Sequence, residues 1–315
     1  MCERVSRANR ERRQMIDYRE RISELKERRG AVIVAHNYVE GEVKEVADFV
    51  GDSLELSLKA RELQASVLVF CGVRVMAETA KILSPASVVL HPVPGAGCPM
   101  AEMASGESVA RYRREHPETV LVAYVNTTAA AKAEVDICCT SANAERIVGG
   151  IESGREVMFL PDRNLGANVS RSLGRRLELW PGFCPTHNRI VPETVREMRR
   201  QYPGVELLVH PECVPEVVSL ADAALSTGGM LRYVRESSAR RFLIGTEHGI
   251  LHRMRKENPG KEFIGLSPVV TCPNMKKLTL DSIVSALETM EPRVELPEPL
   301  MERARRPIER MLAVR

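Results

Sequence analysis

The sequence has few aromatic residues: they make up 4% of its 315 residues, and Trp180 is the only tryptophan. Proteins that bind single-stranded nucleic acid stack the bases on aromatic side chains interleaved with basic ones, so this low content argues against such a partner. The net charge of +3 is also too small and too dispersed to indicate binding to a polyanion. We therefore expect no nucleic acid partner.

Long hydrophobic runs are missing as well. No apolar stretch approaches the length of a membrane span, and the N-terminus has no hydrophobic signal region. Residues 3–29 are rich in arginine but also contain glutamates, and their apolar residues recur at helical spacing up to Gly30, which predicts a surface helix. We expect a cytoplasmic protein with no membrane partner.

Cysteine is not scarce, but the close C-x-x-C pairs that typify zinc sites are missing. In the cytoplasm, eight cysteines indicate metal or redox chemistry rather than a disulfide framework. Three of them, Cys98, Cys184 and Cys272, are each followed by proline and lie 86 and 88 residues apart. This spacing predicts three similar units of about 87 residues, each of which contributes one thiol to a common centre.

Each unit repeats one order of elements. Short, uniformly apolar runs that alternate with helical patterns predict parallel sheets covered on both faces. The apolar runs are Ala31–Ala35, Val67–Phe70, Val88–Leu90, Val120–Tyr124, Asp136–Cys139, Val157–Leu160, Leu177–Trp180, Val205–Val209, Phe242–Ile244 and Phe263–Gly265. Residues 43–50, between the first two runs, have helical spacing.

The fold class that follows is α/β, with three similar parallel-sheet domains around a pseudo-threefold axis and the metal centre on that axis. We place the first domain at residues 1–104, the second at 105–188 and the third at 189–275. The C-terminal segment, residues 276–315, lies outside the repeat and contains two helical patterns. We expect it to pack back on the first domain.

Polar side chains recur at the carboxyl ends of the predicted strands, where ligands bind in parallel α/β sheets. One set follows the first strand of each unit: His36, Tyr124 and His210. A set of hydroxyls stands where a helix is expected to begin: Ser53, Ser141 and Thr227. These hydroxyls are either plain helix caps or, since they recur threefold, a shared site for carboxylates or phosphate. No phosphate-binding glycine fingerprint is present.

Thiolates select zinc or iron–sulfur clusters, and a cubane cluster normally takes four cysteines. Three thiolates without a fourth would leave one iron open, and an open metal position acts as a Lewis acid. This predicts a dehydration or condensation on a small anionic substrate. Side chains near strand ends could supply acid–base groups, although each alone can equally be a hydrogen-bonded structural residue. They are His36, Tyr38, Tyr124, His187, His210 and Glu212.

The segments that carry these residues closely resemble the quinolinate synthase family, in order, from about Ala31 to Met290. The resemblance rests on a series of motifs that is far more specific than any single one. Among them are Ala35-His36-Asn37-Tyr38, Gly51-Asp52-Ser53, Ala123-Tyr124-Val125-Asn126, Asp136-Ile137-Cys138-Cys139-Thr140-Ser141, Trp180-Pro181-Gly182-Phe183-Cys184-Pro185, His210-Pro211-Glu212-Cys213, Gly245-Thr246-Glu247 and Cys272-Pro273-Asn274-Met275.

The resemblance implies three α/β domains around one [4Fe-4S] cluster per chain, held by Cys98, Cys184 and Cys272. The implied reaction condenses iminoaspartate with dihydroxyacetone phosphate to quinolinate, phosphate and two waters, a step of NAD biosynthesis, and the open iron is the Lewis acid. These two small molecules are the implied partners, together with transient contact with the enzyme that supplies iminoaspartate.

It also implies roles for individual residues. Tyr38 matches a residue implicated in proton transfer, and we expect His36, Tyr124 and Glu212 to take part in it as well. The substrate-binding positions are His36, Ser53, Tyr124, Val125, Asn126, Ser141, His187, His210, Pro211, Glu212 and Thr227. One departure is Val269, which stands where some relatives carry a further cysteine close to the third ligand, so the proposed disulfide switch of those relatives is missing here.

Two other functions use the same architecture. An isoprenoid diphosphate reductase also holds a three-cysteine cluster between three domains, but it requires an electron donor. A non-enzymatic protein with the metal as a structural staple predicts a closed site with four ligands.

Overall fold

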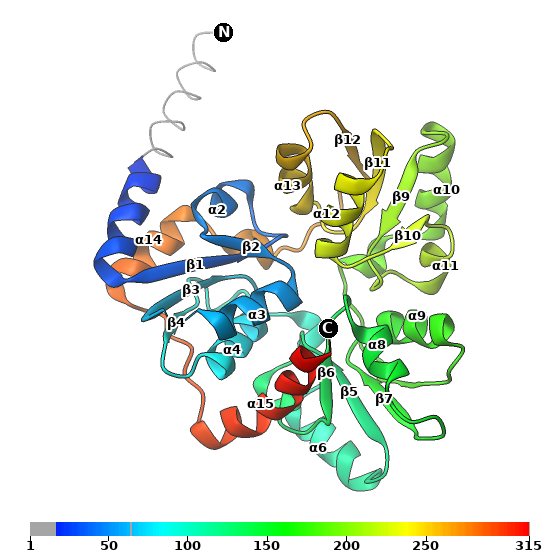
Figure 1. Cartoon of the computed structure of the whole chain (residues 1–315), viewed down its shortest axis with the longest axis horizontal. Helices are drawn as coiled ribbons and strands as arrows, with labels where there is room; N and C mark the ends of the chain where they lie inside the picture. Colours follow the sequence, from blue (N-terminus) through cyan, green and yellow to red (C-terminus); the bar gives the residue numbers. More distant parts are fainter. Residues whose placement is uncertain (1–16, 64, 315) are drawn as a thin grey trace.

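The computed structural model describes residues 17–63 and 65–314, and these residues form three four-stranded sheets arranged around a common centre (Figure 1). The first sheet consists of β1 (Ala31–His36), β2 (Phe49–Gly51), β3 (Val67–Cys71) and β4 (Val88–Leu90). The second consists of β5 (Val120–Tyr124), β6 (Ile137–Cys139), β7 (Val157–Leu160) and β8 (Glu178–Leu179). The third consists of β9 (Glu206–Val209), β10 (Ala223–Ala224), β11 (Arg241–Gly245) and β12 (Glu262–Gly265).

All three sheets have the same topology. The strand orders are β2-β1-β3-β4, β6-β5-β7-β8 and β10-β9-β11-β12, and every pair of named strands is parallel. The predicted α/β class with three similar parallel sheets is therefore confirmed. One expectation was wrong: Phe49–Gly51 does not continue a helix but forms strand β2 beside Val34–His36.

An aspartate repeats with the same period as the cysteines. Asp48, Asp136 and Asp222 each accept, through a side-chain oxygen, the backbone N–H of a residue fifteen positions earlier in the first strand of the unit. Each of these carboxylates also pairs with a basic side chain, from Lys26, Arg113 and Arg199 respectively. The threefold repeat thus extends to single hydrogen bonds that join a loop to its sheet.

Helices cover the faces of the sheets, as parallel strands require. In the first unit they are residues 17–29, α2 (Gly41–Val46), α3 (Ser53–Glu62), α4 (Arg74–Leu83) and α5 (Pro99–Glu102). The second unit has α6 (Gly106–Glu115), α7 (Ala129–Lys132), α8 (Ala144–Gly149), α9 (Arg163–Leu173) and the 3-10 turn η1 (His187–Arg189). The third has α10 (Pro192–Gln201), α11 (Pro215–Val218), α12 (Thr227–Glu236), α13 (Ile250–Glu257) and η2 (Met275–Lys277).

The N-terminal helix was predicted over residues 3–29, and the structure describes it from residue 17 to 29. Its residues Ile22 and Leu25 are fully buried in the first core, as their helical spacing predicts. The earlier part of that prediction lies outside the described residues. No described helix is long and apolar enough to cross a membrane.

The two C-terminal helices go to different units. Helix α14 (Leu280–Thr289) packs into the core of the first unit through Ile283 and Leu287. Helix α15 (Glu298–Ala313) instead packs into the core of the second unit through Ile308 and Met311, beside α7 and β6. We expected the whole C-terminal segment to pack on the first domain, and this expectation is wrong for α15. The apolar stripe of α15 instead covers the surface formed by α7 and β6.

The packing of α15 leads to a first prediction. Replacing the fully buried Ile308 with alanine should destabilise the protein by about 2–5 kcal/mol, because it leaves a cavity in the second core. Urea denaturation measures this loss. A matched change on the exposed face of the same helix, Glu309→Ala, should stay within about 0.5 kcal/mol of the wild type. Equal effects of the two changes would contradict this placement of α15.

Candidate active site

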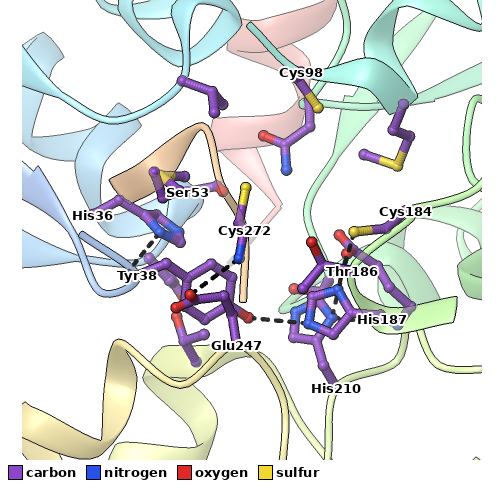
Figure 2. A pocket seen from close by; sticks show the side chains of 18 of the residues that line it. His36, Tyr38, Ser53, Cys98, Cys184, Thr186, His187, His210, Glu247 and Cys272 are labelled. Carbon is purple, nitrogen blue, oxygen red and sulfur yellow. Dashed lines mark hydrogen bonds and ion pairs between the residues drawn. The ribbon is translucent and has the colours of Figure 1, made fainter. Parts of the chain in front are cut away.

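The three units meet around a cavity of about 70 Å³ whose walls come from all of them. Figure 2 shows Cys98, Cys184 and Cys272 converging on this space, with His36, Tyr38, His187 and His210 close by. The cavity lies at the carboxyl ends of the strands. Four of its lining residues are at or just after the ends of β1, β5, β9 and β11, namely His36, Tyr124, His210 and Glu247. This edge is where parallel α/β sheets place their ligands.

The structure brings most of the predicted site residues to this one cavity. Those that line it are His36, Tyr38, Ser53, Cys98, Tyr124, Asn126, Ser141, Cys184, His187, His210, Glu212, Thr227 and Cys272. Two predicted substrate-binding residues, Val125 and Pro211, do not line it. Val125 borders a smaller neighbouring cavity, and the Pro211 carbonyl accepts a hydrogen bond from Asn168, so substrate contact by these two residues stays a prediction.

Each Cys-Pro pair opens one helical turn. The carbonyl of each cysteine accepts the N–H of the residue four positions later: Glu102 at 3.2 Å for Cys98, Asn188 at 2.9 Å for Cys184 and Lys276 at 3.3 Å for Cys272. The first position inside such a turn has no partner for its N–H, and proline has a suitable fixed φ and no N–H to leave unpaired. The repeated proline therefore starts the turn that presents the thiol to the cavity.

The donor set fits a metal centre built from thiolates. The other described cysteines, Cys71, Cys138, Cys139 and Cys213, are buried away from the cavity, and none of the described cysteines forms a disulfide. Burial raises the pKa of the Cys98 thiol to about 12 and that of the Cys184 and Cys272 thiols above the ordinary value. Such thiols become ligands when a metal displaces their protons.

A second donor group overlaps the first. Ligand atoms of Cys184, His187 and Glu212 all lie within 4.8 Å of one another, close enough to hold a single metal ion. The set of three thiols and this mixed set share Cys184 and differ in their other donor atoms. Soft thiolates alone favour zinc or an iron–sulfur cluster, whereas a mixed sulfur, nitrogen and oxygen set accepts a wider range of ions.

Two histidines at equivalent places in the repeat have the same tautomer. The Nδ1 atom of His36 accepts the backbone N–H of Tyr38 at 3.2 Å, and that of His210 accepts the backbone N–H of Glu212 at 3.3 Å. Burial lowers the pKa of both histidines to about 3, so both are neutral near pH 7. Since Nδ1 accepts, the proton of each ring is on Nε2, and each ring offers one donor.

A chain of side chains connects Tyr38 to Glu212. The Tyr38 hydroxyl lies 2.5 Å from Oγ1 of Thr246, which lies 2.8 Å from Nε2 of His187. The other ring nitrogen of His187 lies 2.6 Å from Oε2 of Glu212 and 3.2 Å from Sγ of Cys184. With Nδ1–H donating to the carboxylate, Nε2 accepts from Thr246, which in turn accepts from Tyr38. The chain is a continuous path for a proton through buried groups.

Glu212 is the ionised group of the site. Burial alone would raise its pKa, but the imidazoles of His187 and His210, with hydrogen bonds from His187 and Tyr124, outweigh burial and hold the pKa below the ordinary value. Burial and the charge of Glu212 together raise the pKa of Tyr124 well above the ordinary value. The same two causes raise the pKa of Asp162 to about 8. The negative charge of this region is therefore concentrated on Glu212.

The three predicted hydroxyls are not helix caps. Asp52 caps α3 by accepting the N–H groups of Leu54 and Glu55, and Ser226 caps α12 by accepting from Gly229. Ser53 and Thr227 are the next residues, the first of each helix, and they line the cavity. Ser141 also lines it, two residues before the N-terminal flank of α8. The interpretation of these hydroxyls as plain helix caps is therefore wrong, and the shared site for carboxylates or phosphate stays a prediction.

Two buried carboxylates that sequence reasoning missed support the cysteine loops. Asp162 accepts the backbone N–H of Cys184 at 2.9 Å, and Glu247 accepts that of Cys272 at 3.2 Å. Glu247 is fully buried and pairs with Lys276 at 3.0 Å. Both carboxylates follow the third strand of their units, so their shared position in the repeat was the available signal. Thr246 was missed because a lone threonine after a strand has no distinguishing pattern.

Comparison with known proteins agrees with this geometry. Residues 20–313 match the family model described as "Quinolinate synthetase A protein". The chain is 51% identical over 293 residues to the quinolinate synthase of Desulforudis audaxviator, which covers 93% of this chain and 97% of the relative. It is 49% identical to the quinolinate synthase of Geobacter metallireducens, covering 94% and 97%. It is 48% identical to quinolinate synthase 2 of Methanosarcina acetivorans, covering 94% and 95%.

Proposed function

The chain belongs to the quinolinate synthase family, and from this premise we propose the reaction carried out in its central cavity. Iminoaspartate condenses with dihydroxyacetone phosphate, and the products are quinolinate, phosphate and two molecules of water, which balances all atoms. The convergence of three thiols, an ionised glutamate and three hydroxyls that do not cap helices in one cavity supports this proposal. The family assignment replaces the alternatives of a reductase and of a structural metal protein.

The cofactor that fits this donor set is a [4Fe-4S] cluster. Cys98, Cys184 and Cys272 would hold it, one from each unit, and no other described cysteine lines the cavity. When bound, such a cluster supplies a Lewis acid at the iron that lacks a cysteine. Every other requirement of the reaction, namely binding, orientation, proton transfer and the exclusion of water, is left to the side chains around it.

Proton transfer is the second requirement, because the reaction removes protons from carbon and releases two hydroxyl groups as water. We assign the base to Glu212, whose carboxylate is ionised and buried. His36 and His210 donate from Nε2–H to substrate oxygens, since their Nδ1 atoms are already occupied. Tyr38 and Tyr124 remain protonated because burial and the charge of Glu212 raise their pKa values, so they act as acids.

Substrate binding is the third requirement, and both substrates are anions. We assign it to Ser53, Ser141 and Thr227, with Asn126 beside them. The side-chain oxygen of Asn126 is buried and has no hydrogen-bond partner among the described residues, so it is available to a donor group of the substrate. Contact with the enzyme that supplies iminoaspartate stays a prediction.

Quinolinate formation by anaerobically purified protein tests the function. Iminoaspartate is generated in the assay from oxaloacetate and ammonia, dihydroxyacetone phosphate is added, and quinolinate is measured without any reductant. Iron and acid-labile sulfide in a ratio of about one to one indicate a cubane cluster. Iron or zinc without sulfide would instead favour a single ion on Cys184, His187 and Glu212.

The proton path through Thr246 leads to a separate prediction. Thr246→Val should lower kcat about tenfold with little change in KM, because the hydroxyl between Tyr38 and His187 is lost. The loss is moderate since the Tyr38 hydroxyl also lies 3.4 Å from Nε2 of His187 and can transfer a proton directly. Steady-state kinetics measure both constants, and Thr246→Ser should recover most of the rate. An unchanged kcat in Thr246→Val would remove Thr246 from the path.

A further inference from the structure

The fully buried side-chain amide of Asn37, which belongs to the first unit, forms hydrogen bonds to two residues of the third unit. Asn37 follows β1, and its Nδ2 donates to Oγ1 of Thr227 at 2.9 Å. Its Oδ1 accepts from Nη1 of Arg253 at 3.1 Å. Arg253 is itself held by the carbonyl of Val50, at 2.8 Å, and by Glu257. Arg253 and Thr227 belong to α13 and α12, so Asn37 lies between two elements of another unit.

The chemistry of these groups determines the direction of every hydrogen bond. A guanidinium group only donates, so the atom of Asn37 that faces Arg253 must be the carbonyl oxygen. The NH₂ group of Asn37 then faces Thr227, and because it only donates, the threonine oxygen must accept. Thr227 has a single hydroxyl proton, and that proton cannot point toward Asn37.

The proton of Thr227 therefore has one direction left. Thr227 is 2% exposed and lines the cavity, and within residues 17–63 and 65–314 no group accepts its hydroxyl proton. The hydroxyl proton is therefore available to a ligand bound in the cavity. A hydroxyl that can only donate suits an anionic oxygen and is unfavourable for a group that itself needs an acceptor.

Among the described residues, only the first unit has an amide that donates to one of the three cavity hydroxyls. Asn37 is the middle residue of the triplet that follows the first strand, and the middle residues of the other two triplets are Val125 and Pro211. Neither of these side chains can form such a bond. Within the described chain, the hydroxyls of Ser53 and Ser141 have no comparable partner, so their direction is not determined in advance. The threefold repeat is thus broken at Thr227.

We propose that Asn37, oriented by Arg253, is a positioning residue that makes the Thr227 hydroxyl an obligate donor to an anionic oxygen of the substrate. This inference rests on the proposed function, because it assumes that an anionic substrate occupies the cavity. The acceptor is an oxygen of a phosphate or of a carboxylate, which share the same chemistry here. Asn37 does not touch the ligand and acts only through Thr227.

Reversing the direction of the amide tests this proposal. Asn37→Asp keeps the shape and the contact with Arg253, now as an ion pair, but its carboxylate accepts from Thr227 and turns the hydroxyl proton away from the ligand. We expect KM for one substrate to rise about tenfold or more while kcat changes less. The thermal midpoint should stay close to that of the wild type, because the buried carboxylate is paired.

A double-mutant cycle separates positioning from a simple charge effect. Thr227→Val removes the donor and should raise the same KM, and Asn37→Asp/Thr227→Val should be no worse than Thr227→Val alone. If the two effects instead multiply, Asn37→Asp acts through its charge or through the fold, and the proposal is overturned. A wild-type KM in the Asn37→Asp variant would overturn it as well.

Binding measurements keep this test distinct from the test of the function. Calorimetry on the cluster-loaded protein with inorganic phosphate and with quinolinate requires no turnover. Weaker binding of phosphate alone in Asn37→Asp identifies a phosphate acceptor, and weaker binding of quinolinate alone identifies a carboxylate. If both bind as in the wild type, the proposal fails. Absence of quinolinate formation by the wild-type protein, in contrast, would refute the proposed function and not the hydroxyl direction.

Discussion

Replacing any one of Cys98, Cys184 and Cys272 with alanine is expected to remove the cluster and to lower quinolinate formation at least about 100-fold. Each thiol comes from a different unit and lines the same cavity, so no neighbouring cysteine can replace a missing one. A metal that acts as a Lewis acid contributes several kcal/mol to transition-state stabilisation, which corresponds to this loss. Iron, sulfide and turnover are measured on the same anaerobic preparations.

The three substitutions also separate the two possible metal sites. A cluster on three thiolates predicts that all three variants lose iron and sulfide together. A single ion on Cys184, His187 and Glu212 predicts that only the Cys184→Ala variant loses its metal. Cys138→Ala is the matched control, because this thiol is buried in the core of the second unit and does not line the cavity. It should keep its cluster and its activity.

Glu212→Gln is expected to lower kcat by a factor of about 100 to 10,000, the range typical for the loss of a general base. Glutamine keeps the size of the side chain and can still hydrogen-bond to His187, but it cannot accept a proton at neutral pH. The iron content should stay at the wild-type level, because in the three-thiolate site Glu212 is not a ligand. Kinetics and iron analysis of one preparation provide both values.

Glu78→Gln is the matched control for this change. Glu78 is also a buried glutamate, and it accepts the backbone N–H of Ala129 outside the cavity, a bond that glutamine can keep. Its variant should turn over within about twofold of the wild type. Near-normal turnover in Glu212→Gln would exclude this residue as the base, and loss of iron in that variant would point to the mixed metal site.

The sequence indicated the repeat because a period of 86 and 88 residues is a property of the chain itself. Strands that are buried on both faces are uniformly apolar, so their positions could be read from composition alone. Strand β2 could not, since the apolar residues from Val43 to Val50 have helical spacing and the three residues Phe49–Gly51 are too few to show a strand pattern. Pairing with Val34–His36 decides its structure.

Helix α15 illustrates a second limit. Its apolar stripe could be recognised from spacing, but an apolar stripe does not specify which surface it covers. The segment was expected on the first domain, and it packs instead beside α7 and β6 in the second unit. Only the shape of the complementary surface selects the partner.

Some residues of the candidate site could likewise be found from the sequence, and others could not. Cysteines at a fixed period, and polar residues at the ends of predicted strands, could be found from the sequence because parallel strands carry their ligand-binding residues at one edge. The roles of Asn37 and Thr246 could not, because each depends on partners from distant parts of the chain. The direction of a hydrogen bond is decided by the group on its other side, and only the tertiary structure brings that group into contact.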